Sequence, residues 1–170
     1  VVAKRIKRSE GYFFQFLYQM HKLVTFIFTG QKVNFGNYCI LTRSDVEKIY
    51  FKASLWSSFS GTVKRNIKVF DEIGSIRGPR YFGPSQMSLL KLIIHSLSII
   101  AVFKYIVFLR STIMLIVLAY LNSYLGNFTV FIQVLIVIFN LFIFTVSLRE
   151  REKDLLSSDN NLDTIKNITQ

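Results

Sequence analysis

The stretch STIMLIVLAYLNSYLGNFTVFIQVLIVIFNLFIFTVSL, residues 111–148, decides the fold of this chain. It contains no Asp, Glu, Lys, Arg or His, and it is far longer than the roughly 20 residues that one transmembrane helix needs. Residues that favour turns cluster near its middle, namely Asn122, Ser123, Gly126 and Asn127. The pattern therefore predicts two transmembrane helices, over about 104–121 and 128–148, joined by a tight loop.

Basic residues flank this predicted hairpin at both ends. They are Lys91, Lys104 and Arg110 before it, and Arg149, Arg151 and Lys153 after it. A hairpin returns to the side that it left, and basic flanks mark the cytoplasmic side of a membrane. We therefore expect an integral membrane protein whose soluble part and both termini are cytoplasmic.

The net charge of +11 lies mainly on the first hundred residues. Such a charge suits anionic lipid head groups or phosphorylated ligands. Because the basic part adjoins a membrane hairpin, lipid contact is favoured over nucleic acid, and no nucleic-acid partner is expected. Cys39 is the single cysteine, which excludes a disulfide framework or a cysteine metal site within the chain.

The residues before the hairpin alternate between strand and helix patterns. Strands are predicted at 1–3, 33–41 and 67–73, and helices at 12–29, 44–51 and 54–65. Ser44 and Glu47 form a capping-box pattern at the start of the second helix. This is α/β alternation. These three strands and three helices are too few for a complete doubly wound sheet. Because the chain also begins without Met, we expect that an N-terminal half is missing.

Four segments follow from these patterns. Residues 1–75 form the α/β part, 76–103 a juxtamembrane loop with an amphipathic interfacial helix, 104–148 the hairpin, and 149–170 a polar cytoplasmic tail.

Arginine residues at two places indicate phosphate binding. Arg5 ends a predicted strand, and Arg77 and Arg80 lie in a loop bounded by glycines. The planar guanidinium group matches phosphate oxygens, although attraction to lipid head groups explains the same charges. Ser85 either donates its hydroxyl to a phosphate or caps the next helix. His21 and His95 are isolated and fit helix faces, so no catalytic residue and no metal ligand is assigned.

The order of several motifs resembles the C-terminal half of bacterial membrane-anchored family 2 glycosyltransferases, relatives of dolichyl-phosphate mannose synthase and similar polyprenyl-phosphate sugar transferases. The motifs are FGNYC (35–39), LW (55–56) followed by VKR (63–65), RGPRYFGPSQM (77–87) and LIIHSLSIIAVF (92–103). The resemblance implies the C-terminal portion of a GT-A-like domain that uses a nucleotide-sugar donor and a divalent metal, Mg or Mn. The acceptor would be lipid-linked or another membrane molecule, at the cytoplasmic face of the bacterial inner membrane.

The resemblance also implies roles for individual residues. Arg5 would face the donor diphosphate, Arg77, Arg80 and Ser85 would lie near the acceptor phosphate, and 86–103 would lie along the bilayer. Asn37 would belong to the acceptor side, but it stands where many relatives have an acidic residue. The metal-binding Asp motif and the nucleotide-binding first strand lie upstream in the family, so this chain is expected to be inactive alone.

The sequence also allows a non-enzymatic function. The chain would then be a non-enzymatic two-helix membrane protein whose basic cytoplasmic domain binds anionic lipid or a protein partner.

Overall fold

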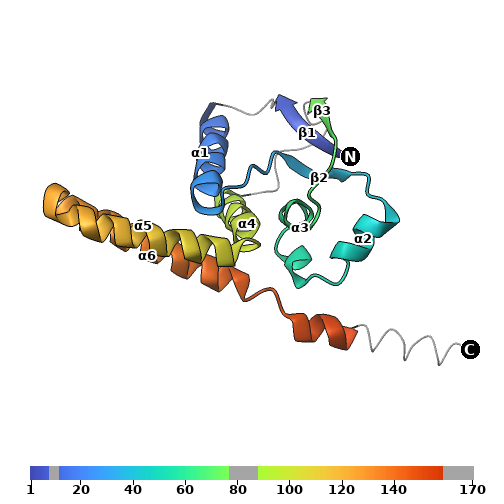
Figure 1. The fold of residues 1–170 in the computed structure, drawn as a ribbon. Coiled ribbons are helices and arrows are strands. Elements are labelled where there is room, and N and C mark those ends of the chain that lie inside the picture. Colours follow the sequence, from blue (N-terminus) through green and yellow to red (C-terminus); the bar gives the residue numbers. More distant parts are fainter. Residues whose placement is uncertain (8–11, 77–87, 159–170) are drawn as a thin grey trace, which may run out of the picture.

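The computed structural model describes residues 1–7, 12–76 and 88–158. A mixed α/β part precedes two long helices that form a hairpin (Figure 1). The elements follow one another as β1 Val2–Lys7, α1 Tyr12–Thr29, β2 Phe35–Cys39, α2 Arg43–Ile49, the 3-10 helix η1 Ala53–Trp56, α3 Phe59–Asn66, β3 Glu72–Ile76, α4 Leu89–Ala101, α5 Lys104–Leu125 and α6 Asn127–Ser147.

The three strands form one mixed sheet in the order β2-β1-β3. β1 pairs antiparallel with β2, where Val2 lies opposite Cys39, and parallel with β3, where Val2 lies opposite Glu72. Val2, Phe35, Ile49, Val63 and Ile67 form a buried core that joins β1 and β2 to α2 and α3. The α/β alternation expected from the sequence is therefore present.

Several predicted boundaries in this part are wrong. The strands predicted at 1–3 and 33–41 are observed at Val2–Lys7 and Phe35–Cys39. The helix predicted to begin at a Ser44 capping box begins at Arg43, because the Thr42 hydroxyl accepts a hydrogen bond from the Asp45 N–H. The single helix expected over 54–65 is divided into η1 and α3, since Ser58 adopts an extended backbone and its hydroxyl accepts from the Gly61 N–H at 3.2 Å.

Another error concerns the last strand, predicted at 67–73 and observed at Glu72–Ile76. Ile67 caps the C-terminus of α3, and its backbone N–H donates to the Val63 carbonyl at 2.9 Å, so this group is unavailable for strand pairing. The sequence predicted a strand at this position because an apolar residue occurs both in buried strands and at buried helix ends.

The hairpin is confirmed as two helices long and apolar enough to cross a membrane. Only 11% and 22% of their most apolar windows are buried within the protein, unlike the core helices of a soluble domain. The turn is tighter than expected, because α5 continues through Asn122 and Ser123 to Leu125. The Thr129 hydroxyl donates to Asn122 Oδ1 at 2.6 Å across the turn. Gly126 supplies the whole connection with φ +61° and ψ −150°, a conformation essentially restricted to glycine.

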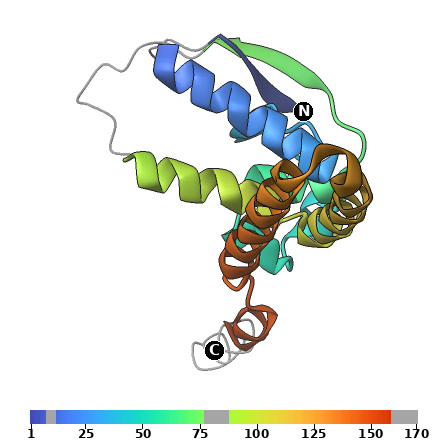
Figure 2. The same ribbon diagram turned by 90° about the vertical axis from the view of Figure 1, so that its left-hand side faces the viewer.

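Helices α1 and α4 cross the base of the hairpin in front of the sheet (Figure 2). Their C-terminal halves share a buried core with the start of α5 and the end of α6, built around Ile100, Val102, Phe103, Val107 and Ile143. Val24 and Phe28 of α1 pack against this core. The predicted helix 12–29 has the observed bounds of α1, and the described part of the predicted amphipathic helix 86–103 is α4.

Candidate functional site

The carboxyl ends of the parallel strands β1 and β3 lie side by side at one edge of the sheet. Arg5 pairs in register with Ser75, and Lys7 with Ile76. The chain leaves β3 at Ile76 and enters residues 77–87, which carry Arg77 and Arg80. In open sheets with parallel strands, ligands bind outside the carboxyl ends of the strands. This edge is therefore the candidate site.

Side-chain contacts between β1 and β3 support their parallel register. The Lys4 ammonium group lies 2.6 Å from Glu72 Oε2, and the Ser75 hydroxyl donates to the Lys4 carbonyl at 3.2 Å. The ion pair is partly exposed, so it contributes on the order of 0–1 kcal/mol. The register shifts between Arg5 and Lys7, where the ladder is irregular.

The predicted site residues differ in what the structure says of them. Arg77, Arg80 and Ser85 lie outside the described residues, and of Arg5 only the backbone is described. Asn37 is exposed in β2, on the opposite side of β1 from β3. The capping role considered for Ser85 is filled by Ser88, whose hydroxyl accepts from the Lys91 N–H at 3.4 Å.

Metal-binding chemistry has no visible support in the described part of the chain. Among residues 1–7, 12–76 and 88–158, no three His, Cys, Asp or Glu side chains gather closely enough to hold a metal ion. His21 lies in α1, where its Nδ1 is 3.4 Å from the Thr25 hydroxyl, and His95 is exposed in α4.

The pKa values of Cys39 and Asp45, both in the described α/β part, are shifted. Partial burial raises the pKa of the Cys39 thiol, an effect opposed by the positive charge of the N-terminal amine. Hydrogen bonds from Lys48 and then Thr42 lower the pKa of Asp45, which stays ionised at the start of α2. Asp45 belongs to the capping contacts of α2, not to the edge formed by β1 and β3.

Sequence reasoning missed three contacts of charged side chains between segments that lie far apart in the sequence. Arg65 Nη1 donates to the Val102 carbonyl at the end of α4 at 2.7 Å, and Arg110 Nη1 donates to the Ile27 carbonyl near the end of α1 at 3.1 Å. Lys104 and Glu150 form an ion pair of 2.8 Å at the base of the hairpin. The separations of 37, 83 and 46 positions left no local signal for these pairs.

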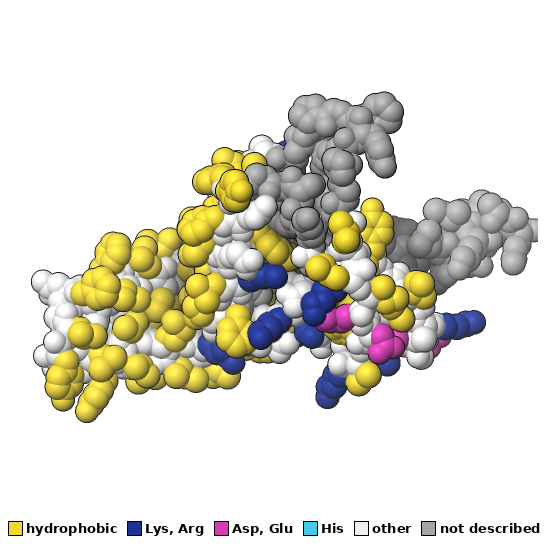
Figure 3. Space-filling view, turned by 90° about the horizontal axis from the view of Figure 1, so that it is seen from above, with side chains coloured by type: hydrophobic (Ala, Val, Ile, Leu, Met, Phe, Trp, Pro, Cys, Tyr) yellow, Lys and Arg dark blue, Asp and Glu magenta, His cyan; other side chains and the backbone are white. Residues whose placement is uncertain are grey.

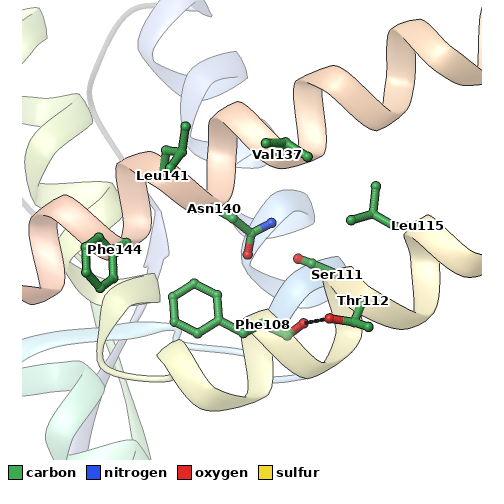
Figure 4. A pocket seen from close by; sticks show the side chains of 8 residues that line it. All are labelled: Phe108, Ser111, Thr112, Leu115, Val137, Asn140, Leu141 and Phe144. Atoms are coloured by element: carbon green, nitrogen blue, oxygen red, sulfur yellow. Dashed lines mark hydrogen bonds between the residues drawn. The ribbon is translucent and has the colours of Figure 1, made fainter.

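Polar side chains also line an open groove of about 360 Å³ between α5 and α6 (Figure 4). Asn140 Nδ2 donates to the Ile136 carbonyl at 2.7 Å. Asn140 Oδ1 and the Ser111 hydroxyl are buried and have no hydrogen-bond partner. Their side chains point into the space between the two helices in Figure 4. A polar atom without a partner is costly inside a membrane.

Comparison of the chain with protein-family models, curated proteins and solved structures finds no match.

Proposed function

We propose that this chain is the acceptor-side and membrane-anchoring part of a family 2 glycosyltransferase. The enzyme would transfer a sugar from a nucleotide-sugar donor to a lipid-linked or other membrane acceptor at the cytoplasmic face of the membrane. The proposal rests on the motif order from FGNYC to LIIHSLSIIAVF, together with a mixed α/β part that precedes two long apolar helices.

The observation that carries the proposal is the meeting of two strand ends. The backbone of Arg5 pairs with Ser75, two positions before the segment that holds Arg77 and Arg80. The chain thus passes this edge at Arg5 and again at Ile76, directly before Arg77 in the sequence, and in the proposal arginines from both segments act there. The chain returns from this edge to α4 at the base of the hairpin, as expected for a phosphate site close to a membrane.

The arginines would act by electrostatic stabilisation. In this proposal Arg5 binds the donor diphosphate and stabilises its charge as it leaves, while Arg77, Arg80 and Ser85 bind the acceptor phosphate. Charge-assisted, bidentate contacts of arginine with phosphate are strong and directional, and such preorganised charge is often the largest contribution to catalysis. The proposal keeps a divalent metal, Mg or Mn, for the full-length enzyme, with ligands outside this chain, because no three His, Cys, Asp or Glu side chains gather among the described residues.

The test uses the full-length gene product in membrane vesicles. Labelled nucleotide-sugars are supplied, and incorporation of label into the lipid fraction is measured for the unaltered protein and for Arg77→Ala and Arg80→Ala. Lys68→Ala is the matched control, because it removes the same charge from an exposed position between α3 and β3. We expect both arginine variants to lose at least about tenfold in transfer, with membrane attachment and the control unchanged.

The outcome of the same variants separates the proposal from a lipid-binding role. A non-enzymatic basic domain would show no sugar transfer in any variant. It would also lose vesicle binding equally with Arg77→Ala, Arg80→Ala and Lys68→Ala, because screened attraction to anionic lipid depends mainly on the charge removed. That result would overturn the proposed activity.

A further inference from the structure

Helix α1 carries an apolar stripe that no other described element covers. Its members are large, lie three or four positions apart and are 40–62% exposed: Phe13, Phe16, Met20, Leu23 and Ile27. Spacings of three and four place them on one face of a helix. Exposed apolar surface of this extent marks an interaction site.

The other faces of α1 already have partners or are polar. Val24 and Phe28 pack into the core shared with the hairpin, and Thr29 is buried there. Gln15, Gln19 and Lys22, again three or four positions apart, form a separate strip that continues at Phe26, which is 47% exposed. The helix thus has one face on the hairpin, one that mixes polar and aromatic residues, and one wholly apolar stripe.

The position of α1 along the hairpin indicates what meets this third face. The Ile27 carbonyl accepts from Arg110, which lies six positions after the start of α5. At 1.5 Å per residue this is about 9 Å along α5 from its first residue, Lys104. The 22 residues of α5 span about 33 Å, close to the roughly 30 Å of a hydrocarbon core. The C-terminal end of α1 is therefore held about 9 Å from the Lys104 end of this span, within the roughly 5–10 Å to which an in-plane helix buries its apolar face.

Figures 1 and 2 agree on the direction of the helix. α1 runs across the hairpin, and it lies in front of the sheet when the molecule is viewed from the side of the hairpin tip. A helix placed in this way lies in the plane of a membrane that the hairpin crosses.

The surface chemistry changes at the same level. In Figure 3, hydrophobic side chains cover the hairpin and continue onto the elements at its base, where Lys and Arg side chains begin. On α1 and just after it, ammonium groups lie beside aromatic rings: Lys22 is 4.6 Å from the Tyr18 ring centre, and Lys32 is 5.4 Å from that of Phe26. Aromatic rings and lysines of this kind are typical of the head-group region.

We propose that α1 is an in-plane membrane helix whose apolar stripe inserts among the outer parts of the acyl chains. Lys22 and Lys32 lie at the level of anionic phospholipid head groups. The partner is a lipid surface, because the stripe adjoins the hairpin at Ile27 and Arg110, and because α1 and the residues just after it carry cations beside aromatic rings. The inference depends on the hairpin crossing the membrane and is independent of any sugar transfer.

The test places a fluorescent label at single cysteines in the full chain with Cys39→Ser. The three positions are Phe16→Cys on the stripe, Gln19→Cys on the separate strip as the matched control, and Ile116→Cys in the hairpin as the membrane reference. The protein is reconstituted in phosphatidylcholine vesicles containing phosphatidylglycerol. Quenching is compared between a lipid that carries a nitroxide near its head group and iodide in the water.

We expect the label at residue 16 to be quenched at least about twofold more by the lipid nitroxide than the label at 19, because an in-plane helix buries its apolar face roughly 5–10 Å into the interface. Iodide should give the reverse order. Equal quenching at 16 and 19 would overturn the proposal, as would protection of 16 from both quenchers, which indicates a protein on the stripe. If the label at 116 escapes the lipid nitroxide, the hairpin itself is not in the bilayer and the inference fails with it.

Discussion

The ion pair between Lys104 and Glu150 closes the base of the hairpin. The two side chains are only 20% and 6% exposed, and Glu150 Oε1 has no hydrogen-bond partner. A buried ion pair of this kind is costly to break because the remaining charge stays buried. The ion pair therefore stabilises the protein only while both Lys104 and Glu150 are present.

Replacing Lys104 with Met should leave Glu150 without its cation and destabilise the protein by about 3 kcal/mol. Thermal unfolding in detergent micelles, followed by helical circular dichroism, measures the effect. The double variant Lys104→Met with Glu150→Leu should recover most of the loss, because no buried charge remains. Equal destabilisation of the single and double variants would show that the charges do not interact.

Asn140 offers a contrasting case inside the hairpin. Its Oδ1 atom is buried without a partner, so Asn140→Leu removes an unsatisfied acceptor as well as one hydrogen bond to the Ile136 carbonyl. We expect the variant to be as stable as the unaltered protein or more stable by about 1 kcal/mol. A clear loss of stability in the same unfolding assay would mean that the amide has a partner in the assembled protein.

Cys39 reports on the packing of β2. Because burial raises the pKa of its thiol, the reactive thiolate forms at higher pH in the folded protein than in the unfolded chain. The pH profile of alkylation by iodoacetamide should therefore have its midpoint at higher pH for folded protein than after unfolding in guanidinium chloride. Coincident midpoints would show that Cys39 is solvated as in a free chain.

At the scale of elements, close contacts determine how α3 meets α4. A Cβ atom on Gly61 would lie 3.1 Å from Val102 Cγ2 and 3.3 Å from the Ile99 carbonyl oxygen. Gly61 is buried, so a larger side chain must displace α4. The contact joins the core below the sheet to the core at the base of the hairpin.

Gly61→Val should therefore cost about 2 kcal/mol through overpacking. Adding Val102→Ala removes the nearest methyl group and should restore part of this stability, which a comparison of unfolding curves in detergent would reveal. If Val102→Ala gives no relief, the loss arises from another close contact of residue 61, such as that with the Ile99 carbonyl oxygen, and not from the Val102 methyl group.

The hairpin turn depends on backbone conformation alone. Nothing lies within 4 Å of a Cβ atom built on Gly126, so Gly126→Ala should destabilise the turn by about 1–3 kcal/mol solely because its φ and ψ are unfavourable for other residues. Unfolding of the full chain in micelles measures this cost. An unchanged stability would indicate that the turn relaxes into a different conformation.

At the scale of the whole molecule, the hairpin predicts that both of its ends face one side of the membrane. In a Cys39→Ser background, Asn127→Cys near the hairpin tip should react with an impermeant maleimide from the outer face of intact cells. Ser157→Cys should react only after the membrane is opened. Labelling of both positions in intact cells, or of neither, would contradict the proposed topology.

The match between sequence and structure depends on how local each feature is. The bounds of α1 and the existence of the hairpin were predictable because spacing and the absence of charge act within a helix length. Predicted helix starts were wrong where a neighbouring residue supplied the N-cap, as when Thr42 capped α2 in place of Ser44. For the candidate site, the sequence pointed to arginines in two segments. It did not contain the parallel pairing of Arg5 with Ser75 that joins those segments at one edge.

The sequence by itself determined that two apolar helices would lie side by side. The stretch 111–148 contains no charged residue, is too long for one membrane-spanning helix, and is interrupted by the turn residue Gly126. Only the tertiary structure decided the strand order β2-β1-β3 and the position of α1 across the base of the hairpin. Those features depend on partners as distant as Arg110 and Ile27, 83 positions apart. Such contacts form only when the whole chain has folded, and no local pattern of residues encodes them.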